Sequence, residues 1–197
     1  MIAPEEQARA DCYGLIARLF HGAPDSQLIA QLLKAPEASA EDEPQDAPLA
    51  EAWREMVEAC RAAVPETLDH EHTGLFVGTG KAEVTPYLSH YVLRHANDNP
   101  LVELRAQLSS LGIGRRETVT EYEDHVSSVC ETMRFLIAVQ QRSLPEQKQF
   151  FERFVHRGLV AFCDAVKASK QARFYRHVAQ FARTFAEVEK SAFEMLG

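Results

Sequence analysis

Three adjacent side chains, Glu123, Asp124 and His125, could take part in chemistry. Two carboxylates and an imidazole can bind a metal ion, transfer a proton or accept a cationic ligand. They lie in the stretch EYEDHVSSVCETM, residues 121–133. Apolar residues follow at helical spacing and predict a long helix over about residues 121–142, with one buried face. That face comprises Tyr122, Val126, Val129, Cys130, Met133, Leu136 and Ile137.

The predicted helix would separate the three side chains. Thr120 and Glu123 fit the S/T-x-x-E capping box that begins a helix, and Thr118 and Glu121 fit it equally well. Successive residues are turned by about 100° around a helix, so the three side chains would face three sides and could not bind one metal ion together. Asp124 is predicted to point away from the buried face.

The sequence offers no further groups that would complete a metal centre or an active site. The four cysteines are widely spaced without a C-x-x-C pair, which favours buried, reduced thiols: Cys12, Cys60, Cys130 and Cys163. His70 and His72 lack the spacing of a helical zinc motif and are predicted to lie at an exposed helix end. We therefore expect no metal and no cofactor. An all-α hydrolase that uses Asp124 and His125 stays open as an alternative.

Composition and charge narrow the class of protein. The chain has 197 residues, 46% apolar and 25% charged, as expected of a globular protein with a substantial core. Its net charge of −8 argues against a nucleic-acid-binding protein and suits a partner that carries positive charge. No apolar run approaches the roughly 20 residues of a membrane span. The acidic start, MIAPEEQARAD, lacks the features of a signal peptide, so we expect a cytoplasmic protein without stable membrane insertion.

Helical spacing of apolar residues recurs almost throughout, which predicts an all-α single domain of about nine or more helices. The expected helices span 4–20, 24–34, 47–64, 65–76, 86–94, 100–111, 121–142, 145–168 and 170–196. An acidic, proline-rich linker is expected over residues 35–48. Residues 109–122 contain two glycines and mixed charges, and we expect a hinge there between two helical lobes.

Two motifs resemble those of a known family. EDHVSSVCETM, residues 123–133, resembles the E-D-H-x-x-x-x-x-E-x-M signature of the TorD/DmsD family of redox-enzyme maturation chaperones. TGLFVGTGKAEVTPYLSHY, residues 73–91, resembles the Y-x-x-L-F-x-G…P-Y-x-S-x-Y stretch of that family. The first two and the last predicted helices are similar as well, so the likeness covers most of the chain. The sequence departs from the family pattern at two places. Leu88 stands where the family often has Glu, and Phe154, Val155 and Gly158 stand at the H, L and W positions of the family's frequent H-L-x-x-W pattern.

The resemblance implies an all-helical chaperone without catalytic activity. Such proteins bind the twin-arginine leader of a molybdenum enzyme, and often its mature part, and delay export until the molybdopterin cofactor is inserted. Formate dehydrogenase and the trimethylamine-oxide or dimethyl-sulfoxide reductases are candidate clients. The alternative is a nitrate-reductase-type assembly chaperone for a non-exported subunit. The resemblance also implies a monomer that can exchange lobes at the hinge to form a minor domain-swapped dimer.

The residues carried over as peptide-binding are Leu75, Phe76, Pro86, Tyr87, Ser89, Tyr91, Glu123, Asp124 and His125. A leader with two arginines and an apolar stretch requires an apolar groove beside anionic acceptors. Phe76 fits the core and the groove equally well, whereas Tyr87 and Asp124 are expected at the groove. Apolar burial should dominate the affinity, at about 0.8 kcal/mol per CH₂. The carboxylates should select guanidinium groups and set the register of the peptide.

Overall fold

The computed structural model describes residues 2–35, 47–78, 81–92, 99–114 and 122–195, and in these ranges the chain is helical throughout apart from turns and one isolated β-bridge. The helices are α1 (Pro4–His21), α2 (Ser26–Lys34), α3 (Ala47–Arg61), α4 (Pro65–His72), α5 (Ser89–Val92), α6 (Pro100–Ser110), α7 (Val126–Ala138), α8 (Leu144–Phe150), α9 (His156–Ala168) and α10 (Phe174–Met195). Two π-helical turns, η2 (Thr73–Val77) and η3 (Phe151–Val155), continue α4 and join α8 to α9. The predicted all-α fold is confirmed.

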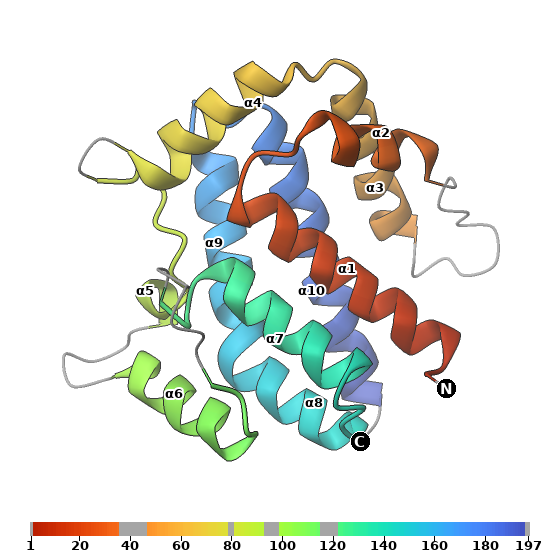
Figure 1. Cartoon of the computed structure of the whole chain (residues 1–197), viewed down its shortest axis with the longest axis vertical. Coiled ribbons are helices and arrows are strands. Elements are labelled where there is room, and N and C mark those ends of the chain that lie inside the picture. The colour runs from red at the N-terminus through yellow and green to blue at the C-terminus, as the bar shows by residue number, and fades with distance from the viewer. Residues whose placement is uncertain (1, 36–46, 79–80, 93–98, 115–121, 196–197) are drawn as a thin grey trace.

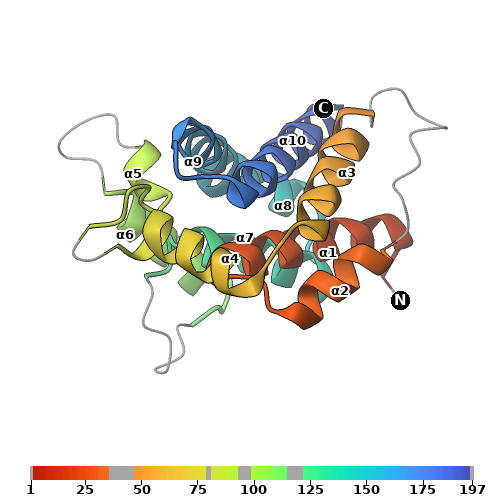
Figure 2. The same cartoon turned by 90° about the horizontal axis from the view of Figure 1, so that it is seen from above.

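The helices form two layers around one core. In one layer α1 packs along α7, and in the other α10 packs against α9, with α3 lying on α10 (Figures 1 and 2). The short helix α5 packs on α9, and α6 lies at the edge of the molecule beside α5 (Figure 1). No described helix combines the length and the apolar character that crossing a bilayer requires.

Aromatic rings hold the two layers together near the end of α1. The ring of Phe20 lies 4.9 Å from that of Phe162 and 5.8 Å from that of Phe76, both in edge-to-face geometry. Phe76 also lies 5.1 Å from Tyr175 on α10. Each fully buried large side chain stabilises the fold by about 1.5–3 kcal/mol. Phe76, expected equally in core or groove, is thus a core residue that is 6% exposed.

A buried ion pair joins the two ends of the chain. Glu189 on α10 is 2% exposed and accepts two hydrogen bonds from Arg9 on α1, at 2.6 and 2.8 Å. The hydroxyl of Tyr13 donates a third to Glu189, at 2.9 Å. Arg9 also donates to Gln147 in the middle of α8, at 3.0 Å. These hydrogen bonds matter because removing one partner of a buried ion pair typically destabilises the fold by about 3–5 kcal/mol.

Glu71 fixes the start of the longest helix. Its carboxylate accepts hydrogen bonds from the backbone N–H groups of Arg173, Phe174 and Tyr175, at 2.8, 3.2 and 2.9 Å. These donors have no partner within the first turn of α10, and the helix dipole favours a negative charge there. Glu71 thereby docks α4, and the η2 turn that follows it, onto α10.

Several predicted boundaries need correction. The predicted helix over 121–142 is shorter, because α7 spans Val126–Ala138 and Gln141 adopts a left-handed backbone with φ of 48° after it. The predicted helix over 86–94 is reduced among the described residues to α5, Ser89–Val92. Residues 145–168 are helical as predicted, through α8, η3 and α9. Residues 36–46 of the expected linker lie outside the described residues, and so do residues 115–121 of the expected hinge. The linker and the hinge therefore stay predictions.

His72 does not lie at an exposed helix end, and that prediction is wrong. It is 8% exposed, with its ring 5.2 Å from Phe76 and 5.6 Å from Tyr175. α4 continues into η2, so the helix end that the sequence suggested does not exist at this position. Burial lowers the pKa of His72 below its ordinary value, although the carbonyl of Phe20 and the charge of Asp69 act in the opposite direction.

We predict that His72 makes the protein less stable at mildly acidic pH. Because the pKa of His72 is higher in the unfolded chain, the unfolded chain binds more protons than the folded one below about pH 6.5. The free energy of unfolding therefore decreases as the pH is lowered through this range. Urea unfolding between pH 5 and 7.5 should therefore show a flatter pH dependence for His72→Gln than for the wild type. His70→Gln, at an exposed histidine, is the control. Identical pH slopes for His72→Gln and the wild type would contradict the prediction.

Close packing between α9 and the residue before α5 generates a second prediction. A methyl group at Gly158 would lie 2.9 Å from Cβ and 3.3 Å from the carbonyl oxygen of Leu88. Gly158→Ala should lower the free energy of unfolding by about 1–3 kcal/mol through overpacking. In Gly14→Ala on α1, the new methyl meets only the flexible Arg134 side chain, so the gain in helix propensity of up to about 1 kcal/mol should prevail. Chemical denaturation measures both, and equal stability of the two variants would refute the packing argument.

Candidate functional site

Two backbone hydrogen bonds bring the two sequence motifs together. The N–H of Leu88 donates to the carbonyl of Asp124, and the N–H of Val126 donates to the carbonyl of Pro86, both at 2.8 Å. These bonds form an antiparallel bridge in which Tyr87 pairs with His125. The carbonyl of Tyr122 also accepts from the N–H of His125, at 3.0 Å, so residues 122–125 form a turn that precedes α7.

The bridge explains why the sequence misplaced the helix start. His125, and neither Thr118 nor Thr120, is the N-cap of α7, so the predicted capping boxes are wrong. Both threonines and Glu121 lie outside the described residues. Tyr122, assigned to the buried face of the predicted helix, is 53% exposed. The six other members of that predicted face are buried, because they belong to α7 itself.

His125 acts in the structure as a buried cap. Its Nδ1 atom lies 3.2 Å from the N–H of Ser127, which donates to it, and 2.8 Å from the hydroxyl of the same residue. Its ring packs edge-to-face against Tyr87 at 5.5 Å. A Ser–His pair could suggest hydrolysis, but Ser127 is only 7% exposed and its backbone is committed to the start of α7. The geometry gives the hydrolase alternative no accessible nucleophile here.

Asp124 is buried, so the prediction that it points away from the core is wrong. Its side chain is 5% exposed, and Oδ1 has no hydrogen-bond partner among the described residues. The turn before α7, which replaces the predicted helix, directs this residue inward. A buried carboxylate oxygen without a partner is rare and costly, which makes it a candidate for binding a donor that arrives from outside.

Glu123 faces a different partner. Its carboxylate accepts two hydrogen bonds from Arg105 on α6, from Nε at 3.0 Å and from Nη2 at 2.9 Å. The guanidinium carbon of Arg105 also lies 5.9 Å from the ring centroid of Tyr122. The hydrogen bond to Glu123 raises the pKa of Arg105, and the charge of Asp124 adds to this. The two adjacent carboxylates therefore have different surroundings: Glu123 pairs with α6, and Asp124 is buried in the interior.

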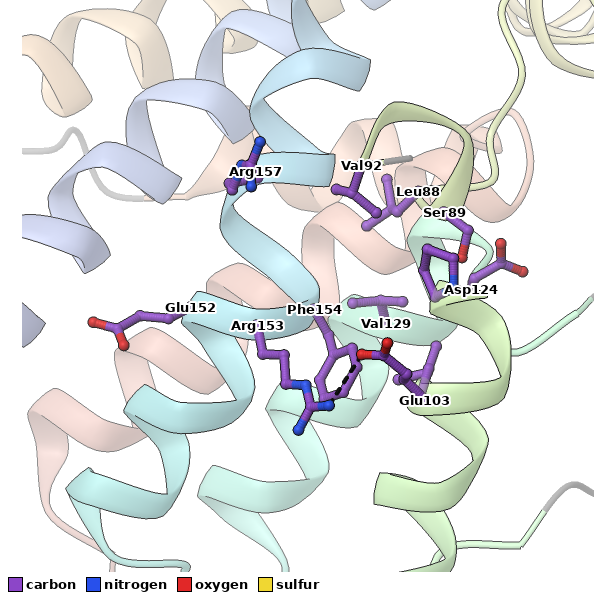
Figure 3. Close-up of a pocket in the computed structure, with 12 residues that line it drawn as sticks. Leu88, Ser89, Val92, Glu103, Asp124, Val129, Glu152, Arg153, Phe154 and Arg157 are labelled. Atoms are coloured by element: carbon purple, nitrogen blue, oxygen red, sulfur yellow. Dashed lines mark hydrogen bonds and ion pairs between the residues drawn. The ribbon is translucent and has the colours of Figure 1, made fainter. Parts of the chain in front are cut away.

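Asp124 is one of the residues that line a pocket of about 400 Å³ between α5, α6, α7 and η3 (Figure 3). Its walls are half apolar and half polar: Leu88, Ser89, Val92, Pro100, Glu103, Leu104, Asp124, Val129, Glu152, Arg153, Phe154 and Arg157. Arg153 donates to Glu103 at 3.0 Å and lies over the ring of Phe154 at 5.2 Å. Figure 3 shows Asp124 beside Ser89 at one side, with Arg153 and Phe154 across the pocket.

Of the nine residues carried over from the resemblance, Ser89 and Asp124 line this pocket. Leu75 and Phe76 are buried in the core at 0% and 6% exposure, and Pro86 is also buried. The others are not in the lining: Tyr87 packs between His125 and Tyr122, and Glu123 pairs with α6. The hydroxyl of Tyr91 donates to the carbonyl of Thr85 at 2.9 Å.

The opposite wall of the pocket was missed in the sequence. Glu103, Arg153 and Arg157 occupy no specified position of either central motif, and their place on α6, η3 and α9 brings them into the same pocket lining as Asp124. A signal existed for Phe154, which stands in the departing H-L-x-x-W pattern. Two of the other departures, Leu88 and Gly158, pack directly against each other.

The side chains around the site offer no metal-binding set. Among the described residues, no group of three or more His, Cys, Asp or Glu side chains could hold a metal ion. The four cysteines are free thiols, and three of them are buried. Burial raises the pKa of Cys130 to about 12 and that of Cys60 to about 11, so these thiols are poor nucleophiles near neutral pH.

Comparison with known proteins identifies the family. The family model described as "Nitrate reductase delta subunit" matches residues 42–187. The fold is similar to that of a crystal structure of a proposed redox enzyme maturation protein from Archaeoglobus fulgidus, with a TM-score of 0.52 and 18% sequence identity over 92% of this chain and 93% of that one. No curated protein matches the sequence. The chain belongs to the nitrate reductase delta subunit family, the TorD-type family of maturation chaperones that its two central motifs predict.

Proposed function

We propose that this protein is a cytoplasmic maturation chaperone that binds the twin-arginine leader of a molybdenum-containing oxidoreductase before export. The observation that carries the proposal is the pocket beside α5, where the Oδ1 atom of Asp124 is buried without a hydrogen-bond partner among the described residues. The family membership supports a chaperone role over a catalytic one.

A guanidinium group suits this pocket chemically. It carries five N–H donors in a planar fork, and charge-assisted hydrogen bonds to a carboxylate are about twice as strong as neutral ones. Asp124 offers a desolvated acceptor, and Ser89 adds a hydroxyl beside it. On the opposite wall, Arg153 lies over the ring of Phe154 at 5.2 Å.

The apolar half of the pocket suits the apolar stretch of a leader. Val92, Leu104, Val129 and Phe154 line it from four helical elements, and Leu88 lines it from the turn before α5. A micromolar complex requires a free energy of binding of about −8 kcal/mol, which burial of a few apolar side chains can largely supply. The carboxylates would then decide which peptide binds and in which register.

The carried-over residues divide into two roles in this proposal. Ser89 and Asp124 would touch the peptide, and Tyr87 would border it. Leu75, Phe76 and Pro86 would hold the connection between η2 and the bridge in place, and Tyr91 would anchor the same connection through its bond to Thr85. Glu123 and His125 would position the turn that presents Asp124.

A second candidate function is the assembly of a non-exported subunit. The description of the matching family model, a nitrate reductase delta subunit, favours it. The pocket would then bind an arginine-containing segment of that subunit. Purification of the protein from its native cells, with mass spectrometry of the bound polypeptide, separates the two. A client with a twin-arginine leader, such as a formate dehydrogenase or a trimethylamine-oxide or dimethyl-sulfoxide reductase, supports the first function, and one without such a leader supports the second.

We predict that Asp124→Asn weakens leader binding. Loss of a charge-assisted hydrogen bond should cost about 1–3 kcal/mol, measured by titration calorimetry with a synthetic twin-arginine leader. Added salt should weaken the wild type more than the variant, because screening acts on the charge. Asp164→Asn is the matched control, since Asp164 is half exposed and pairs with Arg183 far from the pocket lining.

Tyr87→Ala completes this experiment. It removes apolar area and no charge, so it should lower the affinity while leaving the salt dependence unchanged. If Asp124→Asn and Asp164→Asn bind the leader alike, and as tightly as the wild type, Asp124 is not the acceptor.

We also predict that Asp124→Asn does not destabilise the fold. The exchange removes a buried charge whose Oδ1 atom has no partner, at nearly constant volume, so the free energy of unfolding should stay equal or rise by about 1 kcal/mol. Thermal and urea unfolding at neutral pH measure this. A fall of several kcal/mol would show that the carboxylate supports the fold, and a loss of leader binding in the same variant would then say nothing about recognition.

A further inference from the structure

The candidate site already holds a guanidinium group that belongs to the protein itself. Arg105 donates two hydrogen bonds to the Oε2 atom of Glu123, at 3.0 and 2.9 Å, and lies over the ring of Tyr122 at 5.9 Å. A carboxylate below and an aromatic ring beside a guanidinium are the contacts by which proteins recognise arginine side chains. Glu123 immediately precedes Asp124, so this occupied acceptor adjoins one that has an unsatisfied oxygen.

The helix that carries Arg105 is held loosely. Of the 11 residues of α6, only Leu104 and Leu108 are buried, and the helix lies at the edge of the molecule (Figure 1). Besides the pair with Glu123, α6 is tied to η3 by the pair between Glu103 and Arg153, whose side chains are 55% and 50% exposed. Exposed ion pairs contribute little to stability and exchange readily.

We propose that Arg105 is an internal substitute for one of the two leader arginines, and that leader binding displaces it from Glu123. The inference rests on the proposed leader-binding function. One leader arginine would fill the unsatisfied acceptor at Asp124, a gain without an equivalent loss. The other would exchange with Arg105 at Glu123, where one guanidinium replaces another and the net gain is small. The protein therefore distinguishes the two arginines: one contributes most of the charge-dependent affinity, and the other little.

The alternative is that Arg105 has a structural role and does not compete with the leader. If Arg105 serves only to hold α6 as a wall of the pocket, its removal should loosen that wall and weaken leader binding. An internal competitor and a structural clamp thus predict changes of opposite sign for the same substitution.

The test uses the full chain with a synthetic twin-arginine leader and two versions of it, each with one arginine replaced by glutamine. Arg105→Gln should bind the twin-arginine leader about two- to fivefold more tightly than the wild type, in line with the modest strength of exposed ion pairs. The wild type should lose about tenfold or more in affinity with one single-arginine leader and less than about twofold with the other. Arg105→Gln should lose affinity with both.

Arg134→Gln is the matched control. Arg134 pairs with Glu131 on α7, its side chain is 37% exposed against 43% for Arg105, and its removal changes the net charge equally. It should not tighten binding. Arg105→Lys keeps the charge but cannot form the fork of two hydrogen bonds, so it should lie between the wild type and Arg105→Gln, and it serves as the second variant if Arg105→Gln does not fold.

The outcomes separate the inference from the function on which it rests. Unchanged or weaker binding by Arg105→Gln, or equal tightening by Arg134→Gln, overturns the role of Arg105 and leaves leader binding intact. Equal sensitivity of the wild type to both single-arginine leaders also overturns it. If neither the wild type nor Arg105→Gln binds the twin-arginine leader, the proposed function fails and the inference fails with it.

Discussion

The candidate site depends on one short backbone bridge. The bonds from Leu88 to Asp124 and from Val126 to Pro86 connect segments that are nearly 40 positions apart in sequence. They satisfy backbone groups at the start of α7 and thereby end that helix at its N-cap, His125. Because the bridge turns residues 122–125 out of the helix, Asp124 is buried beside the pocket while Glu123 meets α6.

The frame around this bridge is held from both ends of the chain. The buried pair of Arg9 and Glu189 fixes α1 to α10, and Glu71 docks α4 and η2 onto the start of α10. The backbone that follows η2 leads directly to Pro86 and the bridge. Close approach of Leu88 to Gly158 then sets the spacing between the bridge and α9. Most residues that line the pocket belong to helical elements, whereas Leu88 and Asp124 lie in the turns that the bridge joins.

Under the proposed function, the charges of the pocket would make an acidic protein selective. A net charge of −8 would attract a cationic peptide at a distance, but it would not distinguish lysine from arginine. Distinction would require short-range geometry, and the unsatisfied oxygen of Asp124 is the acceptor that we propose for it. Arg153 pairs with Glu103 in the lining of the pocket, and Arg105 pairs with Glu123 next to Asp124 in the sequence.

The sequence by itself determined the helical class, most helix positions and the family, because these follow from apolar spacing and from two local motifs. It placed Val126, Val129 and Met133 correctly on the buried face of α7, since a regular helix obeys a fixed angular step. It failed for Tyr122, Asp124 and His72, whose burial or exposure is decided by partners distant in the chain. Only the tertiary structure brought Arg105 to Glu123 and Arg153 to the pocket of Asp124, because no local pattern encodes which loop supplies the hydrogen bonds that end a helix or which helix covers a turn.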